Sequence, residues 1–351
     1  MNFRPYPGKL SLVSLAVSAC IASGVAQGAG FALYELSAGA AGTANAGRAA
    51  NPEDASIMSS NPAGIAFLDK AQWTFGGAVV MPTGEVKNAS GTKGNTLIGN
   101  TPISSGTGDG GDFLSTAFVS SAYFAAPIDE KWAVGFGMYV PFAAKTEYDD
   151  DFAGRYLATK TELTNINLQS TLSYKFNDDL SFGLGLFASH IEGTLGNKKF
   201  QSLGGQAGLE MDSVMEGDDW GWNIGMLWNA TDKTTIGMSY TSKVDFTVEG
   251  DLKLTGNLQD KAKGHLDLTL PDKFEIGITH QLDDRWTLLA GALWTGWSSF
   301  DEVNAIADEG MVGGINPGDV VTHVPENWKD SWAWSVGAEY KYNAQWRLSY
   351  P

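Results

Sequence analysis

After residue 70, many separate segments of the sequence alternate large apolar residues with small or polar ones. In one of them, Trp132, Val134, Phe136 and Met138 alternate with Ala and Gly. Successive side chains of a β-strand point to opposite faces, so each such segment reads as a strand with one large apolar face. A helix would need apolar residues three and four positions apart, which these segments lack. The pattern therefore predicts an all-β fold.

Short polar corners and longer connections follow each other in strict alternation along this part of the chain. The corners begin at Asp129, Asn177, Thr231, Asp283 and Asn343. The Gly- and Asp-rich connections are expected at 85–112, 146–161, 196–217, 249–264 and 301–330. Short turns on one side and long loops on the other are typical of a transmembrane antiparallel β-barrel of the bacterial outer membrane. A secreted soluble β-sandwich or propeller is the alternative, because the sequence does not show which face points outward.

The alternating segments amount to eleven expected strands. They are 71–84, 113–127, 131–145, 161–176, 179–195, 218–229, 233–248, 265–281, 285–300, 331–342 and an eleventh that begins at 345. Single-chain bacterial barrels have even strand numbers, and an open edge in lipid leaves backbone groups without partners. We therefore expect that the complete barrel has further strands after the eleventh.

The first 28 residues read as a secretory signal peptide. Arg4 and Lys9 precede a short apolar run, Leu10 to Ala22, and small residues lead up to a cleavage site after Gly28. An N-terminal membrane anchor is the alternative, although the run is short for a span.

Residues 29–70 are rich in small side chains and lack the strand alternation, and they contain two Asn-Pro pairs. We expect this segment to form a hatch that plugs a barrel of residues 71–351; a flexible periplasmic arm is the alternative.

Composition argues against several classes of function. The chain has 40 acidic and 23 basic residues and a net charge of −17, so the basic surplus of a nucleic-acid binder is missing. Cys20 is the single cysteine, and the four histidines are scattered without metal-ligand spacing. The run Asp149-Asp150-Asp151 could bind Ca²⁺, but a solvated charge run is the simpler reading. The sequence thus predicts no enzyme, no cofactor, no metal and no nucleic-acid partner.

Several short motifs together resemble the FadL-type long-chain fatty acid transporters, a family that also includes TodX-like aromatic hydrocarbon transporters. The motifs are Ala29 to Ser37, Asn61-Pro-Ala-Gly, Phe124 to Asp129, Val140-Pro-Phe with Thr146-Glu-Tyr, Asn165 to Leu172, Ser181 to Gly185, Asp219 to Asn223, Leu270-Pro-Asp and Trp294 to Ser298. The resemblance implies a 14-stranded barrel with an N-terminal hatch, of which this sequence lacks the last three strands and the C-terminal aromatic.

The resemblance also implies a route for the ligand. Long outer loops capture a hydrophobic molecule, an apolar pocket in the lumen holds it, and a kink in the third strand releases it sideways into lipid. Pro141 lies in that strand, and proline within a sheet marks an edge or a bulge, so Pro141 is expected to form the kink. A proline at the outer end of the strand is the alternative. Asn61, Pro62 and Ala63 are assigned to the hatch; a simple turn at this Asn-Pro pair is the alternative.

The candidate ligand contacts are the apolar residues Phe31, Leu33, Met138 and Phe142. A fatty-acid carboxylate would also need a cation, for which Lys198 and Lys199 are candidates, although solvated loop lysines would look the same.

The function expected from these features is passive uptake of long-chain fatty acids or related hydrophobic molecules across the outer membrane of a Gram-negative bacterium. Uptake of aromatic hydrocarbons is the alternative within the family, and a polar-solute porin or a structural or adhesive surface barrel are alternatives of another class. The expected partners are the hydrophobic ligand, outer-membrane lipid and the barrel-assembly machinery, and the protein is expected to be a monomer.

Overall fold

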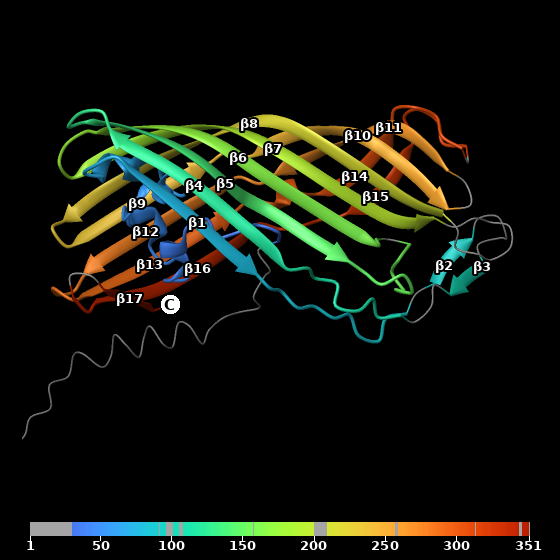
Figure 1. Ribbon diagram of the computed structural model, residues 1–351, viewed down its shortest axis with the longest axis horizontal. Coiled ribbons are helices and arrows are strands. Elements are labelled where there is room, and N and C mark those ends of the chain that lie inside the picture. The colour runs from blue at the N-terminus through green and yellow to red at the C-terminus, as the bar shows by residue number, and fades with distance from the viewer. Residues whose placement is uncertain are drawn as a thin grey trace, which may run out of the picture. The chain divides into compact units, whose positions relative to one another are not determined.

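Antiparallel strands form one long curved sheet that runs from Gln72 to Tyr350 (Figure 1). In the computed structural model, residues 30–90, 92–95, 101–104, 108–156, 158–199, 209–256, 259–312, 314–343 and 346–350 are described, and the predicted signal peptide lies outside them. The strands pair in the order β1-β4-β5-β6-β7-β8-β9-β12-β13-β16-β17. Each of the eleven expected segments overlaps one strand of this path, so the predicted all-β class is confirmed.

The strands of the path have the following bounds: β1 Gln72–Val80, β4 Ala117–Pro127, β5 Trp132–Glu147, β6 Lys160–Lys175, β7 Leu180–Lys199, β8 Leu209–Thr231, β9 Thr234–Thr241, β12 Lys273–Gln281, β13 Trp286–Thr295, β16 Ser331–Lys341 and β17 Arg347–Tyr350. Four more strands join the same sheet off this path: β10 Val244–Gly256, β11 Asp260–Leu270, β14 Glu302–Ala307 and β15 Val320–Pro325. The pair β2 Thr92–Asn95 and β3 Thr101–Ser104 stands apart.

The sheet has a short-turn end and a long-loop end. At the short-turn end the same corner recurs: Asp129 accepts backbone N–H bonds from Lys131 and Trp132, and Asp283 accepts them from Arg285 and Trp286. Such Asx corners fix the chain reversal locally, because the side chain satisfies the backbone donors of the turn. Backbone donation holds the pKa of Asp129 and of Asp283 below the usual value.

At the long-loop end, the expected long connections contain strands in four places. The region 85–112 carries the pair β2 and β3. The region 249–264 is mostly the hairpin of β10 and β11, and 301–330 carries the paired strands β14 and β15. Strand β8 begins at Leu209, nine residues before the expected start. These segments alternate too, but most outward residues of β10 and of the start of β8 are charged, as Glu249 and Glu216 are, so these stretches lack the large apolar outward face by which the other strands were recognised.

The outward face of the path strands carries the large apolar side chains. Trp334 is 76% exposed and Phe75 is 75% exposed, and the same face of β7 carries Phe182, Leu184 and Leu186. The inward face of these strands is small or polar, with Gln169, Thr171, Ser173, Ser181, Asn223 and Ser239 buried. A soluble sandwich or barrel would bury its apolar face, so this arrangement favours a wall that faces lipid.

The N-terminal segment, residues 31–70, lies against the inward face of the sheet near the short-turn end (Figure 1). It contains four short helices: α2 Ala38–Ala41, η1 Arg48–Ala50, η2 Ala55–Ser59 and η3 Pro62–Phe67. Side chains of Ser37, Asp54 and Asn61 accept backbone N–H bonds at three of their starts. None of the described helices is long and apolar enough to span a membrane.

Candidate functional site

Pro141 lies in a bulge of β5. The pairs Tyr139↔Asn167 and Phe142↔Asn165 leave Val140 and Pro141 opposite the single residue Ile166 on β6. Proline has no N–H to donate to the ladder, which explains why the extra residue is found here. The bulge also changes which face later residues occupy: Met138 points outward, whereas Phe142 points inward and is buried.

Strands β4 and β5 separate next to this bulge. Their pairing extends only as far as Ala122↔Met138; beyond it, Ala117–Ser121 of β4 still pair with β1 on the other edge of β4 but have no pair on β5. The N-terminal segment takes the place of β4 beside the bulge: Leu33 N donates to Pro141 O (2.9 Å), and Ala143 N donates to the carbonyl of Phe31 (3.1 Å). A short stretch of the N-terminal segment, rather than β4, therefore completes the sheet edge at this point.

Phe31 inserts its ring into a group of four aromatic side chains. The ring centroids lie 5.7 Å from Phe142, 5.1 Å from Trp297, 5.2 Å from Phe300 and 5.7 Å from Trp328. Edge-to-face contacts at these distances stabilise aromatic pairs beyond the area that they bury. The interior beside the bulge is thus apolar and closely packed.

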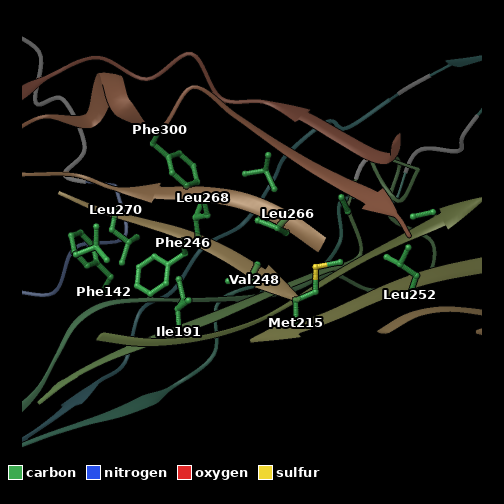
Figure 2. Packing of buried hydrophobic residues seen from close by; sticks show 14 of the residues in the cluster. Phe142, Ile191, Met215, Phe246, Val248, Leu252, Leu266, Leu268, Leu270 and Phe300 are labelled. Carbon is green, nitrogen blue, oxygen red and sulfur yellow. The ribbon is translucent and has the colours of Figure 1, made fainter. Parts of the chain in front are cut away.

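These rings belong to a larger group of buried apolar residues, here called the apolar cluster, which lies toward the long-loop end. Its members come from β5, β7, β8, β10, β11, β14 and the region around Trp297, and Figure 2 shows part of it between Phe142 and Leu252. Phe246, Val248, Leu266 and Leu268 face into it from β10 and β11. The inward face at this end of the sheet therefore resembles the core of a soluble protein.

Polar contacts hold the N-terminal segment at the short-turn end. Asn61 is fully buried; its amide donates to Ala49 O (2.7 Å) and Met226 O (2.9 Å), and its oxygen accepts from Ala63 N (3.0 Å). On the sheet, Ser173 donates to Pro62 O and Ser181 donates to Ala63 O (2.9 Å). Asn61, Pro62 and Ala63 are thus held against three strands of the sheet and do not form an isolated turn.

Strand glycines let this segment approach the sheet backbone. A Cβ at Gly237 would lie 1.8 Å from Ala49 O, and a Cβ at Gly183 would lie 2.3 Å from the carbonyl carbon of Pro62. No side chain fits at either position unless the N-terminal segment moves away. Glycine is used here for close backbone approach.

A small cavity separates the polar contacts from the apolar cluster, and three charged residues line it: Arg48, Lys273 and Glu275. Arg48 Nε donates to Glu275 Oε1 (2.7 Å) and its Nη2 donates to Oε2 (2.9 Å), which ties η1 to β12. Lys273 Nζ lies 4.2 Å from the centroid of the Phe142 ring.

The structure brings together only some of the residues expected to contact a ligand. Phe31 and Phe142 meet in the aromatic group, and Leu33 bonds to Pro141 beside it. Met138 is 41% exposed on the outward face, so it does not share their pocket. Lys198 and Lys199 pair with Glu210 and Leu209 at the end of β7, and their side chains lie outside the described part of the structure.

Sequence reasoning missed the charged residues of the cavity, although a signal was present. Lys273 and Glu275 alternate with Phe274 and Ile276 inside an expected strand, and Arg48 is the single basic residue between 29 and 69. In the described residues, no group of three acidic, cysteine or histidine side chains could hold a metal ion. The run Asp149-Asp150-Asp151 is among these residues.

Comparisons with known proteins agree on one group of relatives. The family model "Outer membrane protein transport protein (OMPP1/FadL/TodX)" matches residues 19–349. Outer membrane protein P1 of Haemophilus influenzae is 31% identical over 330 residues, which cover 84% of this chain and 72% of the relative. The long-chain fatty acid transport protein of Escherichia coli is 27% identical over 95% of this chain and 78% of its own length.

Two solved structures share the fold. A FadL homologue from Pseudomonas aeruginosa superposes with a TM-score of 0.78 at 24% identity, covering 91% of this chain and 79% of that one. The toluene transporter TbuX of Ralstonia pickettii superposes with a TM-score of 0.66 at 20% identity, covering 87% and 83%. Both likenesses support the β-barrel fold.

Proposed function

Because the chain belongs to the OMPP1/FadL/TodX family of outer-membrane transporters, we propose that it takes up long-chain fatty acids and releases them sideways between β4 and β5. The family and the barrel fold place the protein in the outer membrane of a Gram-negative bacterium as a transporter of hydrophobic compounds, not an enzyme. The choice of fatty acid and the lateral route are the proposal.

The observation that carries the proposal is the position of the apolar cluster. It fills the interior at the long-loop end and reaches the bulge at Pro141, beside which β4 and β5 are unpaired. Each buried CH₂ of a ligand contributes about 0.8 kcal/mol, so a dry interior of this kind suits a long acyl chain. An exit at the unpaired stretch would deliver that chain to lipid without passing through water.

The polar contacts at the short-turn end support a closed route to the periplasm. We propose that residues 29–70 form the hatch, residues 71–351 the barrel wall and residues 1–28 the signal peptide. Asn61, Pro62 and Ala63 would keep the hatch in place. Pro141 would keep β5 apart from β4 at the lateral exit, which Phe31 to Leu33 occupy in this structure and would have to leave for release. Phe31, Leu33 and Phe142 would contact the ligand at that exit.

We propose a fatty acid as the substrate, in preference to an aromatic hydrocarbon, because of what the relatives are named to transport. The protein from Escherichia coli, similar over 95% of this chain, is called a long-chain fatty acid transport protein. The toluene transporter of known structure shares 20% identity, which supports the fold alone. Aromatic hydrocarbon uptake remains the second candidate because the interior beside the bulge is lined by aromatic rings.

The test is uptake by a Gram-negative strain that lacks its own fatty acid transporter and expresses the full protein. We expect faster uptake of radiolabelled hexadecanoic acid than in cells with the empty vector, and little change for toluene. The purified protein should give no steady ion conductance in planar bilayers. Ion conductance without fatty acid uptake would support a polar-solute porin instead. The absence of both uptake and conductance would favour a structural barrel.

A further inference from the structure

The cavity at Lys273 lies between the apolar cluster and the N-terminal segment, and residues of both line it. Phe142 and Leu270 line it and also belong to the apolar cluster, while Leu36 and Arg48 line it from the N-terminal segment. An apolar chain lying in the cluster would therefore have one end at this cavity.

Glu275 is fully committed to Arg48. Two parallel N–H···O bonds of 2.7 and 2.9 Å engage both carboxylate oxygens, and both side chains are about nine-tenths buried. Bidentate pairing of this geometry is the strongest form of ion pair, so Glu275 is bound to Arg48 and makes no ion pair with Lys273.

Lys273 has no ion-pair or hydrogen-bond partner among the described residues. Its Nζ faces the Phe142 ring at 4.2 Å, and neighbouring Asp272, just before β12, accepts a hydrogen bond from the Tyr240 hydroxyl (2.7 Å). The attraction between a cation and an aromatic face is small beside the cost of burying an ammonium without an anion. The charged residues that line the cavity carry a net charge of +1.

A second donor without a partner lies close to the same ring. The indole nitrogen Nε1 of Trp297 is buried and makes no hydrogen bond with the residues that the structure describes, and the Trp297 ring lies 5.9 Å from that of Phe142. Buried donors are nearly always satisfied, so unpaired ones in a binding region mark places where a ligand can supply the acceptor.

We propose that Lys273 binds the carboxylate of an amphiphilic ligand whose apolar chain lies in the apolar cluster, and that Lys273 thereby makes the protein select acids over neutral compounds. This rests on the proposed function and adds the residue that sets its substrate class. The carboxylate would neutralise the cavity, and the chain would pass between side chains of the apolar cluster, which must move apart to admit it. Lys198 and Lys199 are then not needed for this role.

The test compares hexadecanoic acid with its methyl ester, which has nearly the same chain but no charge. Binding to the full purified chain in detergent is measured for the wild type, for Lys273→Met and for Lys261→Met, a control lysine that pairs with Asp251 on the surface. We expect the wild type and the control to bind the acid at least tenfold more tightly than the ester. Lys273→Met should bind the acid only as tightly as the ester, with the affinity for the ester unchanged.

Each other outcome overturns a defined part of the account. Equal affinity of the wild type for acid and ester, or a full preference for the acid in Lys273→Met, would overturn the proposal while uptake of hydrophobic compounds stands. Loss of ester binding in both Lys273→Met and Lys273→Gln would show that Lys273 supports the fold and does not select the ligand. Failure of the wild type to bind either compound would count against the proposed function itself.

Discussion

The short-turn and long-loop ends of the sheet use opposite patterns. Near the short turns, large apolar side chains point outward, and inward Ser, Thr, Asn and Gln bond to the N-terminal segment. Toward the long loops, Phe246 and Leu252 point inward while Glu249 and Asp251 face outward. The first pattern suits a wall in lipid and the second a wall in water, so the change along a strand marks the membrane boundary.

A single strand shows where this boundary lies. On the outward face of β7, Leu184, Leu186 and Ala188 give way to His190 and Glu192 within a few residues. The interior changes at about the same level, from hydrogen bonds to the apolar cluster. A ligand bound in the apolar cluster would therefore sit at or above the outer surface of the membrane, and the lateral exit would bring it down into the lipid.

The largest effect is expected where the long-loop end depends on apolar packing. Phe246→Ala should lower the free energy of unfolding by about 3–5 kcal/mol, because it removes a ring that is 2% exposed from the apolar cluster. Denaturant unfolding of the protein in lipid vesicles measures this. Phe182→Ala, at an outward position that is 45% exposed, is the matched control. Equal losses in the two variants would break the distinction between the two ends.

A slightly smaller loss is expected when the ion pair at the junction is broken. Glu275→Gln should cost about 3 kcal/mol, since it leaves Arg48 and Lys273 buried together without an anion. Replacing Arg48 and Glu275 together by Met should recover much of that loss, as measured by the same unfolding experiment. The control Glu162→Gln, whose partners Lys145 and Lys160 are half-exposed, should lose less than about 1 kcal/mol. A loss as large in the control would show that burial of the pair is unimportant.

The hydrogen bonds at the short-turn end predict a local effect. Asn61→Ala should lower the local stability of the N-terminal segment by about 2 kcal/mol, because the carbonyl of Ala49 and the part-buried carbonyl of Met226 lose their donor. Hydrogen exchange of amides in residues 31–70 should speed up, while exchange in β10 and β11 stays unchanged. The control is Asn304→Ala, because Asn304 is partly exposed and bonds to the His323 side chain. It should change amide exchange neither in residues 31–70 nor in β10 and β11. Faster exchange throughout the chain would contradict a division into two ends.

The smallest effect is expected for charges on the outward face at the long-loop end. Hydrogen bonds from Lys261 and Lys263 lower the pKa of Asp251, so these pairs favour the folded state above the ordinary carboxyl pKa of about 4. That contribution is lost as the pH falls from about 4 through the still lower pKa of the folded state. Asp251→Asn should therefore unfold almost like the wild type at pH 7 in high salt. A pronounced loss of stability there would mean that Asp251 acts as a buried group.

Much of the fold could be predicted from the sequence because strand periodicity is local. The corners at Asp129 and Asp283 and the eleven strand segments followed from neighbouring residues alone. The extra strands at the long-loop end were missed because β10 carries acids and lysines on the face where apolar residues were expected. The face of each residue was the harder problem: the bulge at Pro141 places Met138 and Phe142 on opposite faces although both have even numbers.

The candidate site was less predictable because it joins distant parts of the chain. Arg48 and Glu275 are 227 residues apart, and nothing in either local pattern indicates that they pair. Phe31 and Phe142 were predicted as ligand contacts. Trp297 was quoted only as part of the motif Trp294 to Ser298, and neither it nor Trp328 was predicted to complete the aromatic group. Lys273 was overlooked because the search for a cation was directed at loops and not at the inward face of a strand.

The most direct test of the lateral route is uptake by a protein from which Pro141 has been deleted. Removing that residue would leave Val140 opposite Ile166 and keep Phe142 opposite Asn165, so that β5 could pair regularly beyond the bulge. We predict that hexadecanoic acid uptake falls to the level of cells with the empty vector, while the protein still reaches the outer membrane and remains heat-modifiable in gels. Wild-type uptake by this folded variant would contradict release between β4 and β5.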